Sequence, residues 1–282
     1  MVFDELTAGV RQDVQAAVLR VFQERYAGDL ALADTVHLVA AANSPDQAAG
    51  GYEIEGALAN RFCHLNWAFD AAVWAAGMMT GFEQLPAHSV DQLACGTEAS
   101  QASAFGAVTA FTTRHRPDLL QPGMPANPVL AGRAWASPRA WHNAARVLGE
   151  LTPGDVEAPL VAVTGLVGEG PGAEFAGWEQ TNDLPDVEMV LADPHTVDWA
   201  GERPDRLFAL CTAINALGAA GDPGRWVAAV AALTGCAQAS RADVALNATE
   251  MLLRRIPAGQ RLPVATRRVF ADLMIRAELL AA

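Results

Sequence analysis

The chain has 282 residues, of which 51% are hydrophobic and 18% charged, and its formal net charge is −13 at pH 7. This length and composition allow one large domain or two ordinary ones with a buried core, and they exclude wholesale disorder. The acidic balance argues against a nucleic-acid-binding domain and against docking on anionic lipid, because both need a basic surface. We therefore expect no nucleic-acid partner and no membrane partner.

Three residue types limit the chemistry that the sequence can support. The chain contains no lysine, so every basic residue other than histidine is an arginine. Its four cysteines lie far apart without a CxxC pair, and the six histidines show no paired ligand spacing. Neither set predicts a zinc site or a dense disulfide framework. With no signal-like N-terminus and no apolar stretch of roughly 18 residues, we expect a reduced, cytoplasmic protein.

The first part of the chain has an α/β pattern. Short apolar runs of strand length alternate with helical spacing of apolar residues, and a Gly-Asp pair between two short runs is typical of a hairpin turn. The predicted elements are a strand at Val2-Phe3, a helix over Gln12–Glu24, a hairpin over Tyr26–Leu30, a strand over Val36–Ala42 and a strand over Phe62–Trp67.

After Trp67, helical periodicity replaces the strand pattern. The segments between the expected helices contain Pro and Gly, which end helices. A soft boundary falls near Leu184-Pro185. The predicted helices cover Ala71–Met79, Ala94–His115, Pro138–Leu151, Val187–Leu191, Pro204–Ala219, Arg225–Cys236, Ala242–Arg255 and Thr266–Leu280.

An acidic pair, Asp4-Glu5, directly follows the first strand. An apolar strand that ends in Asp-Glu is the Walker B pattern, in which the aspartate holds Mg²⁺ through its water shell and the glutamate polarises the water that attacks a γ-phosphate. Taken alone, the same residues are more typical of a solvated strand end, because acidic pairs after strands are common.

Three polar residues follow in a fixed order. Asn43 ends the second long apolar strand, where a side-chain amide can help to place a water, although an asparagine before Pro45 also suits a turn. Arg61 follows Leu58-Ala-Asn60 and can stabilise phosphate charge in a neighbouring subunit, or can be a surface arginine in an ion pair. Arg139 stands in the first turn of a helix that Ser137 caps, where it can meet nucleotide phosphates or serve only helix initiation.

The order of these residues resembles that of MoxR-like AAA+ ATPases, particularly a bacterial branch with a long helical C-terminus. The resemblance is carried by VAAANSPDQAAGGY at 39–52, LANRFCHLNW at 58–67, GRAWASPRAW at 132–141 and VGEG at 167–170. It covers most of the chain and is strongest at 2–67 and 132–170.

The resemblance implies a role for each site residue. Asp4 and Glu5 are the Walker B pair, with Asp4 toward Mg²⁺. Asn43 is sensor 1, Arg61 the arginine finger and Arg139 the sensor 2 residue that contacts ATP. The family suggests ATP-driven, often hexameric rings that remodel or mature other proteins in a chaperone-like manner, commonly with von Willebrand factor A domain partners.

The implied fold is an α/β remnant of a AAA+ P-loop NTPase core followed by a mostly α-helical lid and a C-terminal helical domain. The corresponding ranges are 1–70 for the partial core, 71–184 for the helical lid and 185–282 for the C-terminal domain. We expect the α/β part to be less stable than the helical parts, because its strands lack neighbours that the family's five-stranded sheet would supply.

One departure from the family pattern limits the expected activity. The Walker A loop, G-x-x-x-x-G-K-[ST], is absent, and without any lysine it cannot be hidden elsewhere in these residues. That loop supplies the N–H groups and positive charge around the phosphates. We therefore expect an N-terminally truncated ATPase that neither binds ATP tightly nor hydrolyses it alone. The alternative is a non-catalytic interaction subunit that inserts into a ring of complete subunits.

A second motif superficially resembles a nucleotide-binding turn of another kind. Leu160 to Val167, followed by Gly168-x-Gly170, superficially fits a dinucleotide-binding turn. No acidic residue follows a convincing second strand, and Pro171 lies inside the loop. We therefore predict a helix–turn–helix there.

Overall fold

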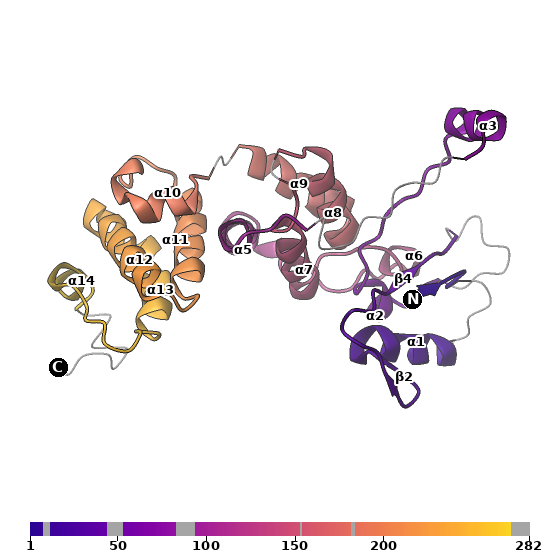
Figure 1. The fold of residues 1–282 in the computed structure, drawn as a ribbon, viewed down its shortest axis with the longest axis horizontal. Coiled ribbons are helices and arrows are strands. Elements are labelled where there is room, and N and C mark those ends of the chain that lie inside the picture. The colour runs from indigo at the N-terminus through magenta and orange to yellow at the C-terminus, as the bar shows by residue number, and fades with distance from the viewer. Residues whose placement is uncertain (8–11, 44–52, 83–93, 153, 182–183, 272–282) are drawn as a thin grey trace.

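The computed structural model describes residues 1–7, 12–43, 53–82, 94–152, 154–181 and 184–271. The small α/β part lies at one end of the molecule, the helices that follow it lie in the middle, and the last helices lie at the other end (Figure 1). Within the described ranges, no helix combines the length and the apolarity that crossing a membrane requires.

The N-terminal part contains two sheets of two strands each in the residues described. β1 pairs in parallel with β4, and β2 pairs antiparallel with β3 through a turn in which Gly28 has φ +63°, so the predicted hairpin is confirmed. The elements are β1 Val2–Phe3, α1 Gln12–Glu24, β2 Tyr26–Ala27, β3 Leu30–Ala31, β4 Val39–Ala40, α2 Gly56–Ala59 and α3 Ala71–Thr80.

The strand predicted over Phe62–Trp67 is wrong. These residues form no strand. Instead, the His64 N–H donates to the carbonyl of Gly165, 2.7 Å away, so the segment is held by a helix rather than by a sheet. The contact does not bury the apolar run, since Leu65 is 67% and Trp67 99% exposed, and a short apolar run alone does not define a strand.

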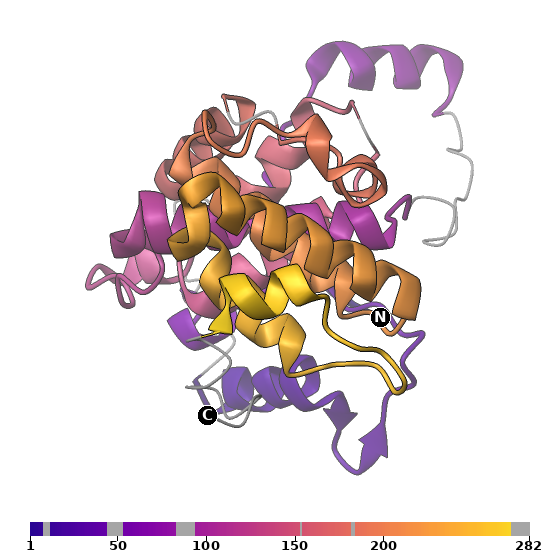
Figure 2. The same ribbon diagram turned by 90° about the vertical axis from the view of Figure 1, so that its left-hand side faces the viewer.

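Helix α3 stands apart from the body of the molecule (Figures 1 and 2). It begins at Asp70, whose carboxylate accepts the N–H groups of Ala72 and Val73, and it confirms the predicted helix over 71–79. None of its residues is buried, although its sequence is almost wholly apolar. The helix is therefore stabilised by its cap and by local contacts rather than by a core.

The remaining described elements are helical. Most predicted helices are confirmed, with ends set by local capping: α5 begins four residues later than expected because Thr97 and Ser100 form a capping box. The elements are α5 Glu98–Ala110, a π-helical turn η1 Phe111–His115, η2 Pro117–Leu119, α6 Pro128–Ala131, α7 Pro138–Leu148, α8 Glu157–Val167, α9 Glu169–Gln180, α10 Val187–Ala192, η3 Pro194–Thr196, α11 Pro204–Gly218, α12 Pro223–Cys236, a π-helical turn η4 Ala237–Arg241, α13 Ala242–Leu253 and α14 Val264–Val269. The end of the helix predicted over Thr266–Leu280 lies outside the described residues.

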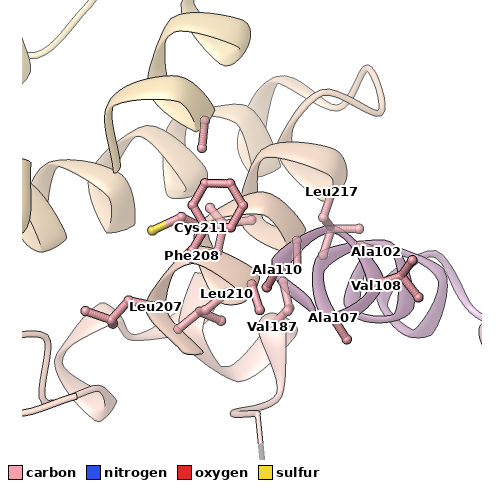
Figure 3. Packing of buried hydrophobic residues seen from close by; sticks show 14 of the residues in the cluster. Ala102, Ala107, Val108, Ala110, Val187, Leu207, Phe208, Leu210, Cys211 and Leu217 are labelled. Carbon is pink, nitrogen blue, oxygen red and sulfur yellow. The ribbon is translucent and has the colours of Figure 1, made fainter. Parts of the chain in front are cut away.

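One hydrophobic core runs through both helical parts, on either side of Leu184. Its centre is the packing of α5 against α11, and Ala102, Ala107 and Ala110 of α5 are among its buried residues (Figure 3). The backbones approach closely because Gly106 has no side chain: a Cβ there would lie 2.4 Å from the Ala209 carbonyl oxygen. This contact joins a helix before the predicted boundary to a helix after it.

The helix–turn–helix predicted around Gly168 is confirmed. Residues 157–167 form α8, residues 169–180 form α9, and Gly168 between them has φ +94°, which favours glycine. The segment that would be the first strand of a dinucleotide-binding unit is therefore a helix, and the dinucleotide interpretation is excluded.

Candidate functional site

The parallel pairing of β1 with β4 sets the first half of the candidate site. Val2 pairs with Val39 and Phe3 with Ala40, and the ladder continues through hydrogen bonds from Ala41 N to Phe3 O (2.8 Å) and from Leu6 N to Ala41 O (2.9 Å). Because parallel strands end at the same edge of a sheet, the residues after both strands lie together.

Asp4 and Glu5 lie at that edge with exposed side chains. The Asp4 carboxylate accepts the Glu5 N–H at 3.0 Å, and Glu5 has a left-handed backbone, with φ 50°. For a residue with a side chain this conformation costs roughly 1–2 kcal/mol. The chain therefore turns sharply after β1 and leaves both carboxylates facing solvent.

Asn43 belongs to the same edge. Its carbonyl oxygen accepts the Thr7 hydroxyl at 3.4 Å, and its side chain is exposed. The predicted Walker B pair and the predicted sensor 1 residue thus end two neighbouring parallel strands. Residues 44–52, which follow Asn43 in the motif, lie outside the described residues.

Arg61 follows the short helix α2 and is partly buried. Its guanidinium donates to the Ala57 carbonyl and, at 2.7 Å, to Oε1 of Gln23 near the end of α1. Arg61 is therefore tied to both α1 and α2, and it does not extend freely into solvent.

Asn60 connects Arg61 to the helix that carries Arg139. Its amide nitrogen donates to the Trp135 carbonyl at 2.8 Å, and its amide oxygen accepts the Ser137 hydroxyl at 2.7 Å. The same Ser137 oxygen accepts the Ala140 N–H and so caps α7. Asn60 and Ser137 are both buried, so this network fixes the start of α7 against the loop that carries Arg61.

Arg61 and Arg139 lie close enough to repel each other. Burial lowers the pKa of the Arg61 guanidinium, and the charge of Arg139 lowers it further. Both side chains contribute positive charge to this part of an otherwise acidic chain. A multiply charged anion bridging the two guanidinium groups would relieve that repulsion.

A second basic group lies near this pair in sequence. The Nε2–H of His64 donates to the Ala59 carbonyl at 2.9 Å, and burial lowers the pKa of the His64 imidazole. The hydrogen bond to Ala59 opposes that shift, whereas Arg133 adds to it. Burial and the charge of Arg133 therefore both favour the neutral form of His64.

The two halves of the site are linked through aromatic rings rather than through polar contacts. The ring centroid of Phe3 in β1 lies 5.0 Å from that of Phe22 in α1, and the centroid of Phe22 lies 4.6 Å from that of Phe62. Within the ranges that the structure describes, no hydrogen bond or ion pair joins Asp4 or Glu5 to Arg61 or Arg139. The structure thus brings together Asp4, Glu5 and Asn43 in one group, and Arg61 and Arg139 in another.

Two positioning residues had no role in the sequence interpretation. Asn60 binds the loop that carries Arg61 (the arginine loop) to the start of α7. Gly165 allows this loop to pack closely against α8, since a Cβ there would lie 2.5 Å from the His64 carbonyl oxygen. An amide side chain directly after apolar Leu58-Ala59 was the available signal for Asn60. A glycine inside an apolar helical run was the signal for Gly165.

The residues present fit only part of a magnesium–nucleotide site. No group of three or more His, Cys, Asp or Glu side chains that could hold a metal ion occurs among the described residues. A single aspartate with solvent access matches the usual protein share of a Mg²⁺ site that phosphates complete. The two arginines fit phosphate oxygens. The sequence contains neither a P-loop nor a lysine to cradle them.

Comparisons with known proteins returned no matching family model, no matching curated protein and no matching solved structure.

Proposed function

We propose that this chain supplies part of the nucleotide site of a MoxR-like AAA+ ATPase, which drives remodelling or maturation of partner proteins by ATP hydrolysis. In this proposal Asp4 and Glu5 form the Walker B pair, Asn43 is sensor 1, Arg61 is the arginine finger and Arg139 is sensor 2. The phosphate-cradling loop is not among these 282 residues, so the chain alone does not turn over ATP.

The observation that carries the proposal is the placement of Arg61 near Arg139. These residues come from separate motifs, and the buried Asn60–Ser137 hydrogen bond joins the loop of Arg61 to the start of the helix of Arg139 although the two like charges repel each other. The repulsion between the two guanidinium groups is unfavourable, and binding of an anion such as a polyphosphate would offset it.

The acidic edge provides the second support. Asp4, Glu5 and Asn43 end adjacent parallel strands, and the edge at the carboxyl ends of parallel strands is where α/β proteins bind ligands. When bound, Mg²⁺ with ATP would supply the phosphoryl chemistry. Asp4 would orient the water shell of the ion, and Glu5 and Asn43 would orient a water.

A nucleotide series tests this proposal. The affinity of the purified chain is measured by calorimetry for ATP, ADP and AMP with Mg²⁺, at low and high salt. We expect weak, salt-sensitive binding that increases with the number of phosphates. Arg139→Ala or Arg61→Ala should weaken ATP binding by about tenfold, the loss expected when one charge-assisted hydrogen bond is removed.

Arg146→Ala is the matched control. Arg146 lies on the same helix, α7, seven residues after Arg139 and close to the same face. If the arginines act as general surface charge, all three substitutions will weaken ATP binding equally and the site assignment is wrong. Binding that does not depend on the number of phosphates would contradict it as well.

The second candidate is a non-catalytic subunit that enters rings of complete ATPase subunits, and the absence of a P-loop from the sequence favours it. It predicts that adding the chain to such a ring changes the ATPase rate of the ring in an Arg61-dependent way. No change on addition, or an equal change with Arg61→Ala, would exclude this candidate. A clear ATPase rate of the purified chain that Glu5→Gln abolishes would contradict both candidates.

A further inference from the structure

Helices α11 and α12 meet along a narrow seam. Gly218 of α11 faces Ala229 of α12 so closely that a Cβ on Gly218 would lie 2.4 Å from the Ala229 Cβ. Cys211 lies seven residues before Gly218, and Cys236 lies seven residues after Ala229. Seven residues make about two helical turns, so the two cysteines face each other on the same seam.

The two sulfur atoms are neighbours inside the core. The Cys211 thiol donates to the Cys236 sulfur at a distance of 3.8 Å, and the side chains are 1% and 0% exposed. Figure 3 shows the Cys211 sulfur on the side of α11 away from α5. Most buried cysteines act only as small apolar side chains, but two in direct contact can also react with each other.

The two thiols are not equivalent. The hydrogen bond from Cys211 lowers the pKa of the Cys236 thiol, and the Arg241 guanidinium lowers it further, whereas burial and Asp243 oppose these effects. The pKa of Cys211 is raised, first by its role as hydrogen-bond donor to Cys236 and then by burial. Cys236 is therefore the nucleophilic partner, because the thiolate is the reactive form.

The backbone beside Cys236 leaves regular helical geometry. Cys236 ends α12, and the π-helical turn η4 that follows includes Ala239 and Ser240 outside helical angles, with Ser240 at φ 66°. Such turns occur where a helix is strained, and irregular ends open more readily than helix centres. A small oxidant can therefore reach Cys236 through local opening of this turn.

We propose that Cys236 and Cys211 form a reversible intramolecular disulfide whose oxidant is a small hydroperoxide such as hydrogen peroxide. The Cys236 thiolate attacks one peroxide oxygen and breaks the O–O bond, which gives a sulfenic acid and releases hydroxide. The Cys211 sulfur then attacks the Cys236 sulfur, loses its proton and displaces water. One peroxide accepts two electrons, and the resulting S–S bond joins α11 to α12.

This modification is independent of the nucleotide site. It lies in the C-terminal helices, and its readout uses no nucleotide, so its failure would not affect the ATPase proposal. The bond would close a loop between residues 25 apart in sequence and would restrict the unfolded chain. The oxidised protein should therefore unfold at a higher temperature than the reduced protein.

The test uses the full chain with Cys63→Ser and Cys95→Ser, which removes the two exposed cysteines. The folded protein is treated with hydrogen peroxide, alkylated after denaturation and examined by mass spectrometry. We expect both remaining thiols to resist alkylation, the intact mass to fall by two hydrogen atoms, and dithiothreitol to reverse both changes. Persistence of two alkylatable thiols, or oxidation beyond the disulfide as the first product, would overturn the proposal.

Single substitutions assign the order of attack. Cys211→Ser should leave a sulfenic acid at Cys236 that dimedone traps, whereas Cys236→Ser should leave Cys211 unoxidised under the same treatment. Equal trapping at either remaining cysteine would contradict Cys236 as the nucleophile. The parent protein with both cysteines already tests disulfide formation if either single variant does not fold.

Discussion

Asn60 is the residue that couples the two candidate arginines. Its side chain bonds to the carbonyl of Trp135 and to the hydroxyl of Ser137, and Ser137 in turn caps the helix of Arg139. A buried polar group of this kind stabilises only when each of its partners is present, because an unsatisfied amide inside a protein loses its water without replacement.

Ser137→Ala should therefore cost more than the loss of an ordinary helix cap. It removes the cap of α7 and leaves the Asn60 amide oxygen unsatisfied, for a combined loss of roughly 2–3 kcal/mol. Thr97→Ala removes an exposed cap from α5 and should cost only about 1 kcal/mol. Urea unfolding measures both values, and equal losses would show that the Asn60 contact contributes nothing.

His64 gives the stability a defined pH dependence. Its pKa is lowered in the folded protein by burial, whereas the unfolded value is about 6.5. Below about 6.5 the unfolded chain binds the proton more readily, so this contribution to the free energy of unfolding falls as the pH drops toward the folded pKa. The contribution is fully present above 6.5.

Unfolding of the wild type and His64→Gln at pH 7.5 and pH 5.5 isolates this effect. The wild type should lose more stability between the two pH values than the variant does. Burial raises the pKa of Glu179, which acts in the opposite direction, but that residue is present in both proteins and cancels in the difference. An identical pH dependence of both proteins would contradict the assignment.

At the scale of elements, glycines decide which segments approach each other. Gly165 of α8 admits the backbone of the arginine loop, with His64 N bonded to the Gly165 carbonyl. Gly177 of α9 has no heavy atom near the position of a Cβ, within 4 Å. A substitution at Gly165 therefore tests close packing, whereas the same substitution at Gly177 tests only helix propensity.

Gly165→Ala should destabilise the protein, and Gly177→Ala should stabilise it. The added methyl at Gly165 meets backbone that cannot rotate away, at a cost of about 1–3 kcal/mol. The methyl at Gly177 meets only solvent and gains about 0.5–1 kcal/mol of helix propensity. Chemical denaturation of the two variants provides the comparison, and a change of the same sign in both would refute this account of the α8 contact.

Elements with local signals were predictable from the sequence. The hairpin around Gly28, the cap at Ser137 and the turn at Gly168 each depend on a few adjacent residues, and each is observed. The segment 62–67 was mistaken for a strand because its apolar run has strand length, whereas its backbone contact with a distant element goes from His64 to Gly165 of helix α8. The late start of α5 depended on which of several polar residues acts as the cap.

The site itself was predictable by residue but not by arrangement. Asp4, Glu5 and Asn43 were each assigned from the strand that precedes them, and the structure shows that these strands pair in parallel and end at one edge. The closeness of Arg61 and Arg139 depends on Asn60 and Ser137, which are 77 residues apart in sequence. A local sequence pattern cannot predict a contact between residues so far apart in the chain. The hydrogen-bond network could therefore be identified only from the folded structure.

At the scale of the whole molecule, the buried surface is unevenly distributed. The core joins α5 to α11, α12 and α13, whereas the paired strands are two residues long and none of the residues of α3 is buried. Trp67, next to α3, is 99% exposed. Segments with few buried contacts open at a lower free energy than the core.

Hydrogen exchange should therefore divide the molecule into two classes. Amides of α5, α11 and α12 should exchange through global unfolding, and those of β1, β4 and α3 should exchange much faster. Mass spectrometry of peptides from residues 1–43 and 53–82 against those from 98–110 and 204–236 makes the comparison. Equal protection of both sets would contradict the predicted difference in stability.

A titration of the isotope-labelled chain with Mg²⁺ and ATP, followed by NMR at Asn43, Arg61 and Arg139, tests most directly the proposal that the acidic strand edge and the two arginines contact one nucleotide. We expect shifts at all three residues that saturate with a single dissociation constant, with Arg146 unchanged. Shifts at the arginines without any at Asn43, or shifts of equal size at Arg139 and Arg146, would contradict it.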